Sequence, residues 1–238
     1  MASERALPEL RSCYPCRGAD EVAARACEEA VFGRRFGNTA EELAAEYGPY
    51  EATTSFGAVL RPDGTAVGAV RLVAPGARGL KTLVDAAGPP WRVPDDVLAA
   101  VAGGAVGPEG PAAPLTWDVA TFGVDSVAAG GDRRIAAALF GVMFGAFADH
   151  GVTCFVAMLD SGARRAIERL GVRLLDLPGA QAAPYLGSAS TVPAYRQVAD
   201  LHDEHRTRFP DLHDPVFHGR GLPGVVGRPV AQTVGAVA

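Results

Sequence analysis

The chain has 238 residues, of which 48% are hydrophobic and 21% charged, and its formal net charge is −5. This length allows one sizeable core, or one core plus an appendage. The 22 basic residues are spread along the chain without forming a stripe, which argues against a nucleic-acid partner. The chain has no uncharged apolar run long enough to span a bilayer and no basic-then-apolar leader, so we expect a cytoplasmic protein without a membrane partner.

The four cysteines are too few for a disulfide scaffold in a chain of this length. Cys13 and Cys16 have the spacing of redox and zinc sites, but only Cys27 lies near them. Such a site would need a second ligand pair or a β-α-β context. We therefore expect ordinary cytosolic thiols in an N-terminal arm, residues 1–19.

The first half of the chain predicts two helices followed by a β-hairpin. Asp20 is expected to cap the first helix, and Thr39 to cap the second, with Glu42 completing a capping box. Strands are expected over residues 52–61 and 66–73, because the Pro-Asp-Gly sequence between them favours a tight turn.

A long Gly- and Pro-rich connection follows over residues 74–114, interrupted by residues 80–87 and by a helical segment at 94–101. After it, helical and strand-like apolar spacing alternates. The expected order is strand, helix, strand, helix, strand, at residues 117–124, 133–150, 152–159, 161–170 and 173–177. Two consecutive β-α-β units in this stretch imply an α/β domain.

This order, with its Leu-Gly-Val ending at residues 170–172, resembles the C-terminal half of the Gcn5-related N-acyltransferase (GNAT) fold. Four segments resemble landmarks of its autoinducer-synthase branch: residues 28–32, 45–51, 67–72 and 117–124. That branch makes N-acyl homoserine lactones, and its relatives make N-acyl amino acids from acyl carrier protein thioesters. The resemblance covers roughly residues 20–195. It implies a three-layer α/β/α fold with a mixed, V-splayed central sheet.

We therefore expect an arm at residues 1–19, a GNAT-like domain at 20–198, and a polar, His-rich C-terminal extension at 199–238. His202 and His205 in the extension have helical spacing and could share a metal with a carboxylate. A solvated helix explains them as well, and we expect no metal.

In GNAT enzymes the pantetheine arm of the acyl donor pairs like an extra strand where the fourth and fifth strands splay apart. By resemblance, the backbone of Phe122, Gly123 and Val124 would bind an acyl-CoA or acyl carrier protein thioester here. Gly123 could equally mark a bulge.

The donor phosphate would lie at the start of the next helix, where free amides and the helix dipole favour an anion. The residues expected there are Gly130, Gly131, Arg133 and Arg134. The family's Arg/Gln-x-x-Gly-x-Gly/Ala signature is not reproduced, and Asp132 would repel an anion. The two arginines can therefore also be interpreted as the solvated first turn of a helix.

Glu51 and Asp118 match positions where the autoinducer synthases keep acidic residues, and either could accept the proton of an attacking amine. Arg71, Trp117 and Tyr185 are the expected acceptor-binding residues, Arg71 as a carboxylate anchor or partner of the acids. The alternative for the charged residues is a structural salt-bridge network between strands, and Tyr185 could simply belong to the core.

The chain departs from the autoinducer synthases where Glu28, Gly48 and Thr121 replace charged residues of that branch. These losses argue against homoserine lactone synthesis and favour another small-molecule amine, such as an amino acid or a natural-product intermediate. No Cys or Ser stands beside a credible histidine base, so direct attack in a ternary complex is expected. The missing phosphate signature also leaves open a catalytically inactive module that binds a ligand or a partner.

Overall fold

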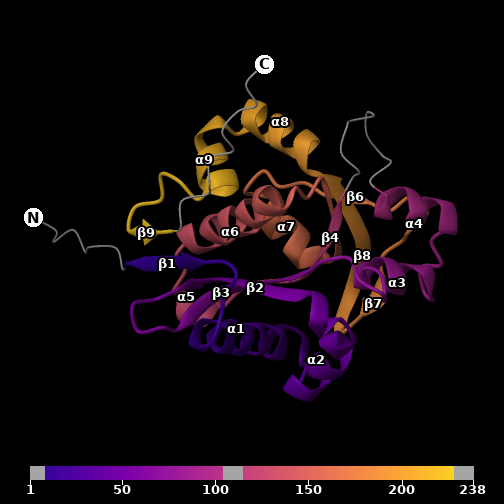
Figure 1. Ribbon diagram of the computed structural model, residues 1–238, viewed down its shortest axis with the longest axis horizontal. Helices are drawn as coiled ribbons and strands as arrows, with labels where there is room; N and C mark the ends of the chain where they lie inside the picture. The colour runs from indigo at the N-terminus through magenta and orange to yellow at the C-terminus, as the bar shows by residue number, and fades with distance from the viewer. Residues whose placement is uncertain (1–8, 104–114, 228–238) are drawn as a thin grey trace, which may run out of the picture.

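A computed structural model describes residues 9–103 and 115–227 and shows one twisted sheet between two layers of helices (Figure 1). Within these residues the sheet has nine strands, in the order β6-β8-β5-β4-β3-β2-β1-β9, with β7 beside β8. The strands are β1 Leu10–Cys13, β2 Thr54–Leu60, β3 Ala66–Val73, β4 Thr116–Val124, β5 Cys154–Asp160, β6 Leu175–Asp176, β7 Ala183–Tyr185, β8 Ser188–Gln197 and β9 Val225–Val226.

The sheet is mixed. Strands β1 to β4 are antiparallel neighbours, β4 and β5 are parallel, and β8 runs antiparallel to β5 and β6. The expected hairpin is β2–β3, and the expected first β-α-β unit is β4, α6 and β5. The α/β fold with a mixed central sheet is therefore confirmed.

Helices cover both faces of this sheet (Figure 1). Along β5, Cys154 and Val156 pack with α3 and α4, whereas Phe155 and Ala157 belong to the cluster around α6. Because successive side chains of a strand point to opposite faces, α6 lies on the face opposite α3 and α4. The helices are α1 Ala19–Phe36, α2 Ala40–Tyr47, η1 Gly48–Thr53, α3 Lys81–Ala87, α4 Asp95–Ala102, α5 Ser126–Ala129, α6 Arg134–His150, α7 Ser161–Glu168, α8 Val198–Arg208 and α9 Pro210–His218.

Local sequence explains the ends of several helices. Thr39 and Glu42 form the expected capping box at the start of α2. Gly151 ends α6 in the left-handed conformation, with φ 69°, which a residue with a Cβ adopts at a cost. Helix α6 also packs closely on the end of α9, because a Cβ on Gly141 would lie 2.6 Å from Cα of Gly219.

The second expected β-α-β unit, β5, α7 and β6, is present in a split form. Strands β5 and β6 are both antiparallel to β8 and therefore parallel to each other, but β6 contains only Leu175–Asp176 of the expected residues 173–177. Strand β8 comes later in the chain and lies between β5 and β6. Pro193 within β8 lacks an amide hydrogen, which removes the usual signature of an internal strand.

Both segments outside the expected domain contribute strands. Leu10–Cys13 of the expected arm forms β1, and Val225–Val226 of the expected extension forms β9, which pairs parallel to β1. The helices α8 and α9 pack on the rest of the structure through α6 and β8. Residues 1–8, 104–114 and 228–238 of the expected arm, connection and extension lie outside the described residues.

Cys13 and Cys16 are side by side, with 2.7 Å between their sulfur atoms, and Cys16 is buried.

None of the described helices is both long and apolar enough to cross a membrane.

Candidate active site

Strands β4 and β5 pair only at their first three residues and then diverge. The last pair is Asp118 with Val156, beyond which β4 continues beside β3 and β5 continues beside β8. The β3–β4 register slips by one residue at Ala120, and such a bulge bends a strand and increases its twist. The result is a V-shaped opening in the middle of the sheet.

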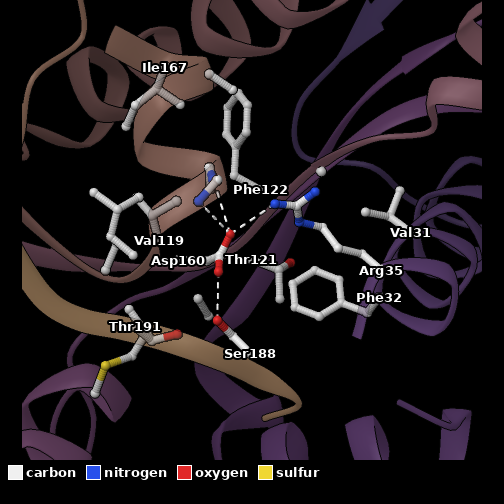
Figure 2. Close-up of a pocket in the computed structure, with 18 of the residues that line it drawn as sticks. Val31, Phe32, Arg35, Val119, Thr121, Phe122, Asp160, Ile167, Ser188 and Thr191 are labelled. Atoms are coloured by element: carbon white, nitrogen blue, oxygen red, sulfur yellow. Dashed lines mark hydrogen bonds and ion pairs between the residues drawn. The ribbon is translucent and has the colours of Figure 1, made fainter. Parts of the chain in front are cut away.

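A cavity of about 350 Å³ occupies this opening. Its walls are the diverging halves of β4 and β5 together with side chains of α1, α6 and α7, and most of the lining is apolar (Figure 2). Because α1 and α6 cover opposite faces of the sheet, the cavity reaches both layers through the gap between the strands. The volume is within the range of small-molecule sites.

The three residues expected to contact the donor, Phe122, Gly123 and Val124, all line the cavity. Gly123 also packs tightly against α1, because an added Cβ would lie 2.9 Å from Cγ1 of Val31. The absence of a side chain at this position therefore allows the close approach of α1 to β4, whatever else binds there.

Asp160 supplies the only carboxylate among the described residues that line the cavity. It accepts hydrogen bonds from Arg35 at 3.0 Å and from Ser188 at 2.6 Å, and it caps α7 through the amides of Gly162 and Ala163 (Figure 2). Although burial opposes the shift, these hydrogen bonds lower the pKa of Asp160. The sequence predicts the cap, but the partners from α1 and β8 follow only from the fold.

Arg71 is buried in a polar network next to the bulge of β4. Its guanidinium makes a bidentate pair with Glu28, at 2.9 Å and 2.5 Å, and lies between the rings of Tyr47 and Phe56. Thr121 donates a further hydrogen bond to Glu28. Two of the positions at which the chain departs from the autoinducer synthases are thus partners of each other and of Arg71.

Glu51 and Trp117 do not line the cavity. The Glu51 side chain is 49% exposed, pairs with Arg25 and lies 3.6 Å from Nη1 of Arg71. Trp117 is buried beneath α6, and its ring lies tilted against that of His150, with centroids 4.8 Å apart.

Asp118 is fully buried at the point where β4 and β5 part. Its carboxylate accepts hydrogen bonds from the amide and, at 2.9 Å, from the hydroxyl of Thr82. Burial raises the pKa of Asp118 to about 6, although the bonds from Thr82 oppose the shift. Asp118 is not among the residues that line the cavity.

A polar group that we call the Lys81 cluster, consisting of Glu46, Lys81, Asp85 and Tyr185, connects this carboxylate with the cavity. The Lys81 ammonium pairs with Glu46 and, at 2.5 Å, with Asp85, and it also contacts the Tyr185 hydroxyl. Tyr185 donates to Asp85 at 2.6 Å and lines the cavity.

Burial and the nearby Asp85 raise the pKa of Tyr185, so its hydroxyl remains protonated. Burial acts to lower the pKa of Lys81, but the carboxylates of Asp85 and Glu46 outweigh this effect, so the pKa is raised. The sequence analysis predicted only Tyr185. The spacing of Lys81 and Asp85 on one helix was the available signal for their pairing.

The sequence matches no family model and no curated protein. Solved structures match the fold. The N-acyl amino acid synthase FeeM from uncultured soil microbes matches with a TM-score of 0.60 at 15% identity, over 83% of this chain and 94% of that one. The CoA-dependent acyl-homoserine lactone synthase BjaI matches with a TM-score of 0.51 at 17% identity, over 94% of both chains. A putative N-acetyltransferase from Lactobacillus plantarum matches with a TM-score of 0.50 at 13% identity, over 80% of this chain and 99% of that one.

This chain has the GNAT fold. The fold expected from the resemblance is therefore confirmed, and the splay of β4 and β5 is the place where that resemblance puts the acyl donor. At identities of 13–17%, the likeness to these proteins is a likeness of fold.

The loop before α6, where we expected the donor phosphate to bind, is not a free anion site. Gly130 and Gly131 have φ values of 59° and 81°, and the loop ends at α6, whose first residue is Arg134. Asp132 accepts the backbone amide of Arg134 at 2.9 Å and its guanidinium at 2.6 Å. A carboxylate of the chain therefore already holds groups that would otherwise face a phosphate. None of Gly130, Gly131, Arg133 and Arg134 lines the cavity.

Proposed function

We propose that this protein is an N-acyltransferase that moves an acyl group from a pantetheine thioester, acyl-CoA or acyl carrier protein, to the amine of a small molecule. The observation that carries the proposal is the apolar cavity between β4 and β5. The edge of β4 beyond Asp118 has no β5 partner, so the amides of a pantetheine arm can pair with it as an added strand. The structural likeness to an N-acyl amino acid synthase and to a CoA-dependent lactone synthase supports this function.

The Lys81 cluster favours a cationic amine as the acceptor. Glu46 and Asp85 against Lys81 leave one net negative charge beside Tyr185, at the cavity wall. An amino acid or a biosynthetic intermediate carries an ammonium group that such a site attracts. Arg71 is fully engaged by Glu28, which makes it a support for the site rather than a free carboxylate anchor.

Asp118 is the proposed acceptor of the amine's proton. Its pKa of about 6 is close to the range in which a general base works best near neutral pH. The proton would reach it through water, since its carboxylate is not at the cavity surface. Glu51 remains the alternative base, with an exposed carboxylate and a partner in Arg25.

Direct attack on the thioester completes the proposed reaction. The neutral amine forms a C–N bond to the carbonyl carbon, the C–S bond breaks, and the departing thiolate takes up a proton. Backbone amides of Phe122, Gly123 and Val124 would stabilise the oxyanion. Among the described residues that line the cavity, none is Cys or His, which favours a ternary complex over an acyl-enzyme.

The test is mass spectrometry of products formed from acyl-CoA and acyl carrier protein donors with a broad panel of amines. Ala166→Phe adds a ring at an exposed position of α7 that lines the cavity and is expected to lower turnover at least 10-fold. Ala26→Phe, at an exposed position of α1 away from the cavity, is the matched control and is expected to keep turnover.

A second function is favoured by one observation. At the expected phosphate site, Asp132 accepts hydrogen bonds from the backbone amide and the guanidinium of Arg134. A protein that no longer binds a phosphorylated donor would tolerate this arrangement. Absence of product with every donor, together with binding of a small ligand that Ala166→Phe weakens, would establish a catalytically inactive binding module. A lactone product from S-adenosylmethionine would instead identify a homoserine lactone synthase.

A further inference from the structure

Three histidines from α8 and α9 meet on the outer side of the helical layer. His202, His213 and His218 each offer one ring nitrogen, and these nitrogens all lie within 4.8 Å of one another. Nε2 of His202 is 3.2 Å from Nε2 of His213. Helices α8 and α9 follow each other directly around Phe209 (Figure 1), so the three histidines come from two consecutive helices.

The spacing of these nitrogens fits a tetrahedral metal ion. Zinc binds imidazole nitrogen at about 2.1 Å, so two ligand nitrogens of a tetrahedral site are about 3.4 Å apart. The pair at 3.2 Å already has this separation, and small ring rotations bring in the third nitrogen.

One further contact of the cluster is typical of a metal-bound histidine. Nδ1 of His202 lies 3.5 Å from the carboxylate of Asp203, which is the kind of outer carboxylate that orients a metal-bound histidine.

His205 has a different role. Its Nε2 contacts the carbonyl oxygen of Leu170 at 2.8 Å, and its ring packs 5.6 Å from that of His213. His205 therefore packs against the cluster without being one of its ligands. The sequence analysis paired His202 with His205 because they have helical spacing, whereas the fold replaces His205 by two histidines of α9.

We propose that His202, His213 and His218 bind one divalent transition-metal ion of the zinc class, with water as the fourth ligand. Imidazole ligands select Zn²⁺ and its neighbours over Mg²⁺ and Ca²⁺, which prefer oxygen. His202 and His218 are partly exposed, which leaves room for the water. This proposal departs from the expectation of a metal-free protein.

The ion ties α8 to α9 and so holds both on α6. The ring of Phe217, between the metal ligands in α9, stacks on Phe144 of α6 with centroids 4.2 Å apart. The three ligands are separate from the cavity lining, and the proposal does not depend on the acyltransferase function. We expect the ion to stabilise the fold.

The experiment uses the full chain without an affinity tag, stripped of metal by a chelator. Titration with Zn²⁺ against a chromophoric competitor is expected to give one equivalent bound with micromolar or tighter affinity. Co²⁺ is expected to show the intense visible absorption of a tetrahedral site, and Zn²⁺ is expected to raise the melting temperature.

His202→Gln and His218→Gln remove ligands at partly exposed positions, and each is expected to lower Zn²⁺ affinity at least 10-fold and to abolish the tetrahedral Co²⁺ band. His150→Gln, at an exposed position on α6 outside the cluster, is the matched control and should change neither. Melting curves in chelator show that each variant is folded. The proposal is overturned if the wild-type chain binds less than one equivalent, or if the two ligand variants bind as tightly as the control.

Discussion

The buried pair of Arg71 and Glu28 allows a quantitative test of how this site is held together. Glu28→Gln keeps the shape of the side chain and removes its charge. Arg71 then stays buried as a cation, with its side chain 4% exposed, between Tyr47 and Phe56. Breaking a buried ion pair on one side typically costs about 3–5 kcal/mol, because the buried charge that remains loses its close partner. Glu51, 3.6 Å from Nη1 of Arg71 and 49% exposed, compensates little of this loss.

For a chain of this size, 1 kcal/mol corresponds to about 2–4 °C in melting temperature, so Glu28→Gln is expected to lower it by roughly 6–20 °C. The matched control is Asp20→Asn. Asp20 also binds an arginine, Arg11, through two hydrogen bonds, but the side chains are 30% and 50% exposed. An exposed pair of this kind contributes about 0–1 kcal/mol.

Removing both buried charges provides the second arm of the test. The double variant Glu28→Leu with Arg71→Met is expected to recover most of the loss, because two apolar side chains can fill the same space. About 1–3 kcal/mol should remain, since Thr121 loses its acceptor. Urea unfolding gives the free energy of unfolding of each variant. If Glu28→Gln costs no more than Asp20→Asn, the pair is not a stabilising element and the argument fails.

Three further predictions concern the strand junction and the packing of α6. Asp118→Asn is expected to lower turnover about 100-fold or more with little loss of melting temperature, and unchanged turnover would remove Asp118 from the mechanism. Because burial raises the pKa of Asp118 from 3.8 to about 6, the folded state holds this proton more tightly, and the carboxyl's contribution to stability falls by about 3 kcal/mol as the pH rises through that interval. Urea unfolding at the two ends of the interval should show this loss in the wild type relative to Asp118→Asn, and equal pH dependence would contradict it. Gly141→Ala places a Cβ against the backbone of Gly219 and is expected to cost about 1–3 kcal/mol, whereas Gly48→Ala, with open space around it, should be close to neutral in the same unfolding assay.

Local signals in the sequence predicted much of the fold. The Thr39–Glu42 capping box, the β2–β3 hairpin and the strand at residues 117–124 each depend on neighbours in the chain, and all three are present in the structure. Strand β8 escaped prediction because Pro193 interrupts its pattern. Its insertion between β5 and β6 is a long-range pairing that no local signal specifies.

The site was less predictable for the same reason. The residues of β4 that line the cavity could be named, because the strand is a local feature and the resemblance to the GNAT fold implies that the donor binds along it. The partner of Arg71 could not, because Glu28 lies on a helix whose rotation against the sheet is fixed by packing. Lys81 and Asp85 were likewise hidden in a connection that lacks a strong pattern, although Asp85 accepts a hydrogen bond from Tyr185, which lines the cavity.

The edge of the sheet has a consequence for synthesis on the ribosome. Strand β1 is made among the first residues, yet its outer edge is covered by β9, where Leu10 pairs with Val225 and Arg11 with Val226. A nascent chain therefore carries an open strand edge until β9 has been made, and open edges recruit strands from other molecules. Chains truncated before β9 should consequently depend on chaperones to stay monomeric, even where the cavity is already complete.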